Sequence, residues 1–266
     1  MAGAAAANFI DVNFDLFRRH SDYEDFIETE DVIAIARAAH RHLGGGVPIL
    51  VPPTYYSLAA GIADNRRIND VLLEAASRLG GKACGVAEPR FGEPAMAEID
   101  RIAAAGAIAV MFSPRAQGCF ANDHVMVEAC GQVARCGMAA MVRSAPYSIN
   151  ESLPRIWELA RSCEQARFIV VGAFASWENI QLVRWNKGGP ANVTYDLSGL
   201  VEAHDLRFLL EDLGGGRLLF GSGGPAHDPV LRSLVDRCTP PGEDRDAVLS
   251  GNARALLKLV AEGATA

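Results

Sequence analysis

Short apolar runs alternate along the chain with longer segments whose apolar residues recur at helical spacing. The short runs are almost continuously apolar, which is the pattern of parallel strands covered on both faces. The pattern predicts strands at residues 8–12, 47–53, 82–89, 107–114, 138–144, 167–174, 192–199 and 217–223. The chain is therefore predicted to be a series of βα units.

The segments between the predicted strands carry one apolar stripe each. Ile68, Val71, Leu72 and Ala75 stand at i, i+3, i+4 and i+7, so one helix face presents all four to a sheet. The same spacing recurs within 206–213, and a further helix is expected near 30–43. Glycines able to adopt positive φ follow the predicted helices at Gly44, Gly80, Gly106, Gly137, Gly188 and Gly214.

Length decides between two ways of arranging these units. A run of βα units can form an open doubly wound sheet or a closed barrel, and periodicity does not choose between them. The chain has 266 residues without a linker or low-complexity tract, and about 250 residues are typical of a (β/α)8 barrel. We therefore expect residues 1–266 to form a single (β/α)8 TIM barrel domain.

The amino-acid composition limits the binding partners and the cell compartment that we expect for this protein. The net charge is −7 and the basic residues are scattered, so we expect neither nucleic acid nor an anionic membrane as a partner. The six cysteines form no CxxC pair, which favours a reducing cytoplasm. The N-terminal residues 1–9 lack a basic region and do not resemble a signal peptide. No uninterrupted apolar segment is long enough to span a bilayer.

Active-site residues of such barrels lie at the C-terminal ends of the strands and in the loops that follow. The polar residues at these positions that we take as site candidates are Asn13, Asp15, Tyr55, Glu88, Arg90, Arg115, Arg143, Ser222 and His227. Three of them are arginines that follow consecutive strands. For Arg90 and Arg115, pairing with acidic neighbours or solvation is as good an interpretation as anion binding.

Several segments together resemble the amidohydrolase-related family of barrel hydrolases and decarboxylases. The matching features are the opening IDVNFD, the GVAEP strand with the following AEIDRIAAAGAIAV, the NVTYDLSG strand, the LLFGSGGPAHDP turn and the closing LSGNARALLKL helix. Each is weak alone, but together they cover nearly the whole chain. The resemblance implies a (β/α)8 barrel with a divalent metal held by side chains at the strand ends.

The sequence departs from the family pattern at the implied metal ligands. Two histidines of the first strand are replaced by Asn13 and Asp15, and the histidine of the fifth strand by Arg143. The histidine after the sixth strand falls at Gly172 or Ala173, and the aspartate of the eighth strand is Gly223. Only Asp15 keeps a metal-competent group, and a fixed cation at 143 repels a metal ion.

The histidines offer little to replace these ligands. His124 is expected to begin a helix on the loop face, and His227 to follow the eighth strand on the same face. His227 and Asp15 could hold a weakly bound divalent metal, but no third ligand is evident. We therefore expect no metal cofactor.

Three functions follow from these substitutions. The first is a non-catalytic or regulatory protein that binds a small anionic molecule, or that pairs with a second copy or a metal-bearing paralogous subunit. The second is a metal-independent hydrolase or lyase for a small carboxylate, in which Arg143 supplies the positive charge and Asp15 or His227 is the acid or base. The third is metal-dependent hydrolysis through ligands that have moved. In the first two, Arg143 points into the barrel, where Asp15, Glu88 or a ligand should neutralise it.

Overall fold

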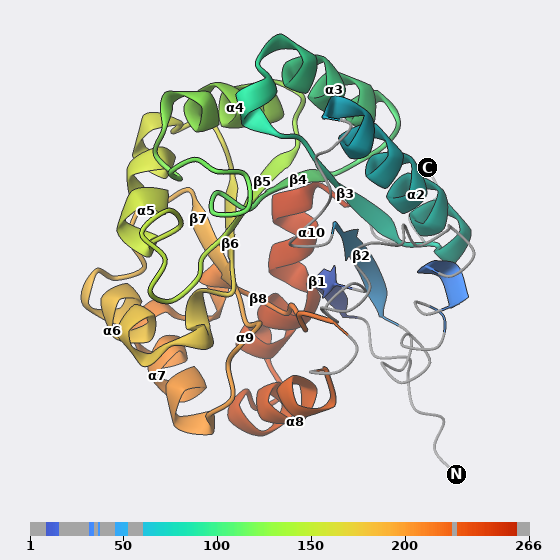
Figure 1. Cartoon of the computed structure of the whole chain (residues 1–266). Coiled ribbons are helices and arrows are strands. Elements are labelled where there is room, and N and C mark those ends of the chain that lie inside the picture. Colours follow the sequence, from blue (N-terminus) through green and yellow to red (C-terminus); the bar gives the residue numbers. More distant parts are fainter. Residues whose placement is uncertain are drawn as a thin grey trace.

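The computed structural model describes residues 9–15, 32–34, 37, 46–52, 61–224 and 228–259. Eight parallel strands lie side by side in chain order, β1 to β8 (Figure 1). They are β1 (Ile10–Asp15), β2 (Val47–Val51), β3 (Lys82–Val86), β4 (Ala109–Phe112), β5 (Ala139–Arg143), β6 (Phe168–Val171), β7 (Val193–Asp196) and β8 (Leu218–Leu219). All eight predicted strands are confirmed.

Backbone hydrogen bonds join the first strand to the segment after the last. The Val12 amide donates to the Phe220 carbonyl at 3.0 Å, and the Gly223 amide donates to the Asn13 carbonyl at 2.9 Å. These bonds bring the two ends of the sheet together. The fold is the predicted (β/α)8 barrel, and an open doubly wound sheet is excluded.

Helices surround the strands (Figure 1). They are α2 (Ile62–Leu79), α3 (Glu93–Ala104), α4 (His124–Arg135), α5 (Leu153–Ser162), α6 (Trp177–Trp185), α7 (Ala203–Leu213) and α8 (Asp228–Cys238). The short α9 (Glu243–Asp246) and α10 (Asn252–Leu257) follow near the end of the chain. The stripes at 68–75 and 206–213 lie in α2 and α7, as predicted. Of the helix expected near 30–43, only 32–34 and 37 are described, and they are helical. No helix in the described ranges has the length and apolar character needed to cross a membrane.

Two apolar cores follow from the alternation of strand side chains. On β5, Ala139 and Met141 pack inside the barrel, whereas Ala140 and Val142 pack in the outer core beneath the helices. Helix α10 adds Leu257 to the inner core and lies within the ring of strands in Figure 1. Its Asn252 side chain donates to carbonyls just before and within β8. The N-terminal end of the barrel is thus plugged, and we call the opposite end, where the strands finish, the barrel mouth.

A β-bulge in β1 changes which side chains face inward. Ile10 and Val12 belong to the inner core, and strict alternation would place Phe14 there too. The pairing with β2 shifts by one residue between Asp11 and Phe14, and Phe14 packs in the outer core instead. The extra residue turns Asn13 and Asp15 toward the interior.

The bulge is held by the carboxylate of Asp11, which is fully buried. Its Oδ1 accepts from the Asn13 amide at 3.1 Å and from the Ser222 amide at 2.9 Å. Its Oδ2 accepts from the Ser222 hydroxyl at 2.6 Å. Charge-assisted bonds of this kind are among the stronger ones in proteins. Asp11 therefore fastens β1 to the loop that follows β8.

Replacing Asp11 should destabilise the barrel well beyond a surface mutation. Asp11→Ala leaves two buried amides and a hydroxyl without their acceptor, so we expect the free energy of unfolding to fall by about 2–4 kcal/mol. Asp70→Ala is the matched control, because exposed Asp70 loses only a surface bond to Arg101 and should change stability by less than about 1 kcal/mol. Urea denaturation measures both. Equal effects of the two substitutions would contradict the anchoring role of Asp11.

Candidate functional site

The barrel mouth contains a cation at the end of β5. Arg143 has the same strand parity as Ala139 and Met141, so its side chain enters the interior. Its Nη2 lies 3.8 Å from Oδ2 of Asp15, with the two side chains 20% and 5% exposed. The bulge in β1 and the alternation in β5 thus bring these two candidate residues face to face.

The guanidinium of Arg143 keeps hydrogen-bonding capacity in spite of this ion pair. Its Nε and Nη2 are buried and have no hydrogen-bond partner within the described ranges, and 3.8 Å from Asp15 is too long for a hydrogen bond. Buried donors in native proteins are nearly always satisfied. Two adjacent guanidinium donors match the two oxygens of a carboxylate.

Asn13 is held on the inner side of the barrel by β7. Its side-chain amide donates to Oδ2 of Asp196 at 2.8 Å and to the Ser198 hydroxyl at 3.2 Å. Oδ1 of Asp196 accepts from the Gly172 amide at 2.9 Å. Asp196 and Ser198 were not among the site candidates, although their place at the end of β7 is the signal that could have found them.

Burial raises the pKa of the Asp196 carboxyl, against the opposing effects of hydrogen bonds from Ser198, Gly172 and Asn13. The charge of Arg143 also acts to lower this pKa. The positive charge of Arg143 therefore favours the ionised form of Asp196.

A second acid near Arg143 comes from a loop. Glu151 is buried, and its Oε2 accepts from the Arg115 amide at 3.2 Å. Burial raises the pKa of Glu151, while that backbone bond and the charges of Arg143 and Arg115 lower it. No motif marks Glu151 in the sequence, because its bond with the Arg115 amide depends on the path of the loop after β5.

The other candidates are distributed around this centre. Glu88 is fully buried just after β3, and its Oε1 bonds Nε of Arg90 at 3.0 Å, with Arg90 47% exposed. Arg90 thus pairs with an acidic neighbour, and the Arg115 side chain is exposed. His124 is the exposed first residue of α4, as expected. Tyr55 and His227 lie outside the described residues.

Ser222 has a structural partner. Its hydroxyl donates to Asp11 and accepts from the Gly224 amide at 3.0 Å. The Cβ of any side chain at Gly224 would meet the Asp15 carbonyl oxygen at 2.2 Å. This turn therefore supports the backbone of Asp15 from the side of β8.

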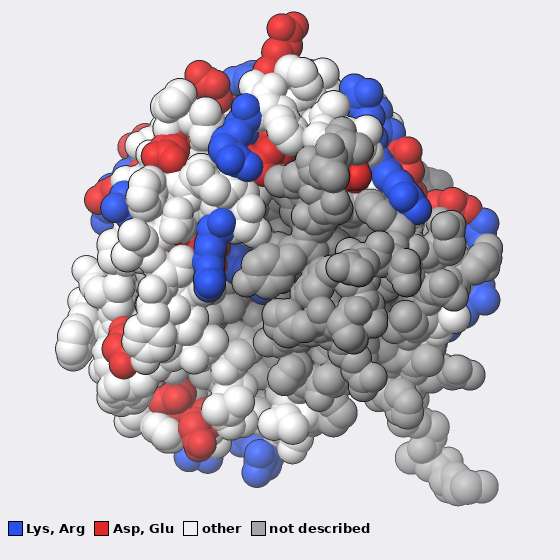
Figure 2. Space-filling model, in the orientation of Figure 1, with Lys and Arg blue, Asp and Glu red and all other residues white. Residues whose placement is uncertain are grey.

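Basic residues do not gather into a continuous patch on the face drawn in Figure 2. Lys and Arg stand singly among acidic and uncharged residues over the coloured part of that view.

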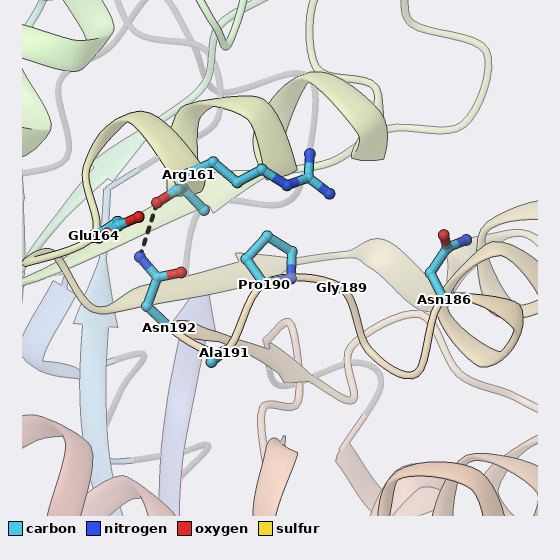
Figure 3. Close-up of a pocket in the computed structure, with 8 residues that line it drawn as sticks. Arg161, Glu164, Asn186, Gly189, Pro190, Ala191 and Asn192 are labelled. Carbon is cyan, nitrogen blue, oxygen red and sulfur yellow. Dashed lines mark hydrogen bonds between the residues drawn. The ribbon is translucent and has the colours of Figure 1, made fainter.

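A cavity of about 550 Å³ lies away from the barrel mouth. Figure 3 shows it between the end of α5 and the segment that leads into β7, with Arg161, Glu164 and Asn192 among its lining residues. The Asn192 side chain donates to the carbonyls of Ala160, Cys163 and Ala166. These bonds join two chain segments at the N-terminal side of the strands, so this cavity does not share the chemistry of the mouth.

The solved structures that are similar to this chain support the same fold. No family model and no curated protein sequence matches the chain. Among solved structures, 5-carboxyvanillate decarboxylase from Sphingomonas paucimobilis has a TM-score of 0.72 at 14% identity, over 95% of this chain and 99% of that one. A putative amidohydrolase from Staphylococcus aureus has a TM-score of 0.73 at 13% identity, over 95% and 100%. A dihydroxybenzoic acid decarboxylase from Polaromonas sp., with bound manganese and the inhibitor 2-nitroresorcinol, has 0.72 at 13%, over 97% and 99%.

Two of our sequence-based expectations are corrected by these matches. The expected non-catalytic or regulatory role is wrong, because the proteins with similar barrels include decarboxylases. The structural similarity to them covers 95–97% of this chain. The expectation of no cofactor is wrong because decarboxylases of this fold were solved with bound manganese. Both expectations assumed that a barrel without the usual metal ligands at its strand ends has no catalytic activity. The active site of such a barrel is built from several loops as well as the strand ends, so these positions alone do not decide its activity.

The described side chains do not fit a manganese ion of that kind. Within the described ranges no group of three or more His, Cys, Asp or Glu residues could hold a metal. Arg143 directs a fixed positive charge at Asp15, the one carboxylate that keeps an implied ligand position. Asn13 contributes at most its amide oxygen, since its nitrogen is bonded to Asp196.

The agreement therefore concerns architecture, at identities of 13–14%. An eight-stranded parallel ring with helices around it is the fold that this chain shares with those structures. The chain has the (β/α)8 barrel fold of the amidohydrolase-type decarboxylases.

Proposed function

We propose that this protein is a lyase that removes CO2 from a small carboxylate substrate bound at the barrel mouth. The observation that carries the proposal is Arg143, whose buried Nε and Nη2 lack hydrogen-bond partners within the described part of the chain. The similar structures support the reaction class, since their names are those of decarboxylases acting on 5-carboxyvanillate and 2,6-dihydroxybenzoate.

Arg143 is suited to hold the substrate carboxylate. Its guanidinium cannot lose its charge at physiological pH, and its planar donors accept a carboxylate in bidentate geometry. The partial burial of the side chain, 20% exposed, strengthens such a bond relative to one in water. A bound carboxylate would also accept hydrogen bonds from Nε and Nη2 of Arg143. Asp15 does not accept from Nη2, because its Oδ2 lies 3.8 Å away.

Decarboxylation replaces a carbon–carbon bond with a carbon–hydrogen bond. The electron pair of the broken bond stays on the substrate carbon, which must take up a proton as CO2 leaves. Asp15 faces Arg143 in the mouth. After it has taken up a proton from solvent water, its carboxyl is placed to deliver that proton to the carbon, with His227 as the other candidate acid. Asn13, Glu88, Arg90, Arg115, Tyr55 and Ser222 remain proposed contacts around the substrate.

The cellular setting is part of the same proposal. All six cysteines are unpaired, and five of them are buried. That state is in keeping with a reducing cytoplasm, where thiols stay reduced. A second copy or a paralogous subunit remains a proposed partner.

Decarboxylase activity should depend on Arg143. We expect the wild-type protein to release CO2 from at least one member of a panel containing 2,6-dihydroxybenzoate and 5-carboxyvanillate, assayed with and without added Mn²⁺. Arg143→Met removes the charge at similar side-chain length, so kcat/KM should fall at least about 100-fold.

The control is Arg161→Met, which removes an exposed arginine beside the cavity of Figure 3. Its kcat/KM should stay within about twofold of the wild type. No CO2 from any carboxylate under either metal condition, or equal rates for wild type and Arg143→Met, would contradict the proposal.

Carboxylate binding should also stabilise the fold. Sodium benzoate should raise the Tm of the wild type above its value in sodium chloride of equal ionic strength, by about 2–4 °C for each kcal/mol of binding linkage. Arg143→Met should lose this shift and Arg161→Met should keep it. Differential scanning calorimetry measures all three, and a shift that survives Arg143→Met would place the anion elsewhere.

A further inference from the structure

The side chain of Asn13, on the inward face of β1, has one buried polar atom without a hydrogen-bond partner among the described residues. Both hydrogens of its side-chain amide have acceptors, Asp196 at 2.8 Å and Ser198 at 3.2 Å. Its carbonyl oxygen Oδ1 is buried and has no hydrogen-bond partner among the described residues. The residue as a whole is only 2% exposed, so bulk water is a poor substitute for the missing donor.

The orientation of this amide is fixed by its neighbours. A carboxylate only accepts hydrogen bonds, so the nitrogen of Asn13 must face Asp196 and the oxygen must face away. Asp196 is itself held by the Gly172 amide at 2.9 Å. Turning the amide over would set its oxygen against a fully buried carboxylate.

The same end of the barrel contains the cation that binds the substrate. Asn13 lies two positions before Asp15 on the inward face of β1, and Asp15 faces Arg143 at 3.8 Å. A molecule held by Arg143 is therefore close to Asn13, and it is the natural source of the missing donor. A carboxylate group cannot itself fill this role, because an ionised carboxylate has no hydrogen to donate.

We propose that the carbonyl oxygen of Asn13 selects, among the small carboxylates bound by Arg143, those that carry a hydrogen-bond donor such as a hydroxyl or amino group. This inference rests on the proposed function and adds a specificity-determining residue to it. A ligand without a donor leaves Oδ1 buried and unsatisfied, whereas a ligand with an ether oxygen sets two acceptors against each other. Sites built to bond a substrate hydroxyl reject analogues that lack it more strongly than apolar pockets reject a size change.

Rigid benzoates test the idea on the unmodified protein. The 2-, 3- and 4-hydroxybenzoates place a donor at three fixed distances from the carboxylate, benzoate has none, and the three methoxybenzoates offer only an acceptor. Isothermal titration calorimetry of each should show at least one hydroxybenzoate binding about tenfold more tightly than benzoate or more. Its methoxy counterpart should bind no more tightly than benzoate.

Asn13→Leu identifies the atom responsible. The variant keeps a similar side-chain volume without the amide, so the ratio of the benzoate Kd to the hydroxybenzoate Kd should fall to about one while benzoate still binds. The matched control is Asn186→Leu, which removes an exposed asparagine at the end of α6 and should keep the wild-type ratio. The measurements on the wild type need no variant, so they test the preference for a hydroxyl group even if Asn13→Leu does not fold.

The outcomes separate this inference from the proposed function. Equal Kd values for benzoate and all three hydroxybenzoates overturn the selection by Asn13 and leave the carboxylate site intact. A hydroxyl preference that persists in Asn13→Leu also overturns it. If wild type binds neither benzoate nor any hydroxybenzoate, the carboxylate site itself is refuted and this inference falls with it.

Discussion

The barrel mouth depends on one ion pair, in which Arg143 at the end of β5 faces Asp15 at the end of β1 at 3.8 Å. The distance is short enough for strong attraction in a partly buried site but too long for a hydrogen bond. Asp15 thus offsets the charge of Arg143 without using its buried Nε and Nη2 as donors. A guanidinium whose buried donors lack acceptors can bind a carboxylate in bidentate geometry. Its positive charge repels a metal ion at the same place.

The backbone makes this pairing possible. Without the bulge between Asp11 and Phe14, the parity set by Ile10 and Val12 would direct Asp15 toward the helices. Asp11 holds the bulge through Ser222. Asp196 fixes the amide of Asn13 beside it. Carboxylates that contact no substrate in this scheme therefore decide which polar atoms the mouth presents.

The barrel architecture could be predicted from the sequence, because the eight apolar runs and the apolar stripes of the helices are local patterns. The inward direction of Arg143 also follows from local alternation along β5. The bulge in β1 could not be predicted, since it depends on Asp11 meeting Ser222, 211 positions away. Glu151 bonds the Arg115 amide from a loop that carries no motif. The functional expectations failed for another reason: replaced ligands describe individual positions, whereas activity depends on the whole mouth.

A crystal structure with 4-bromobenzoate, collected at the bromine absorption edge, tests the central claim most directly. The anomalous signal locates the ring without ambiguity, and the carboxylate oxygens should lie about 2.7–3.2 Å from Nε or Nη2 of Arg143. Bromine at the mouth with the carboxylate on Arg143 is the result predicted. A carboxylate bound elsewhere, with no ligand oxygen near Nε or Nη2 of Arg143, would contradict it.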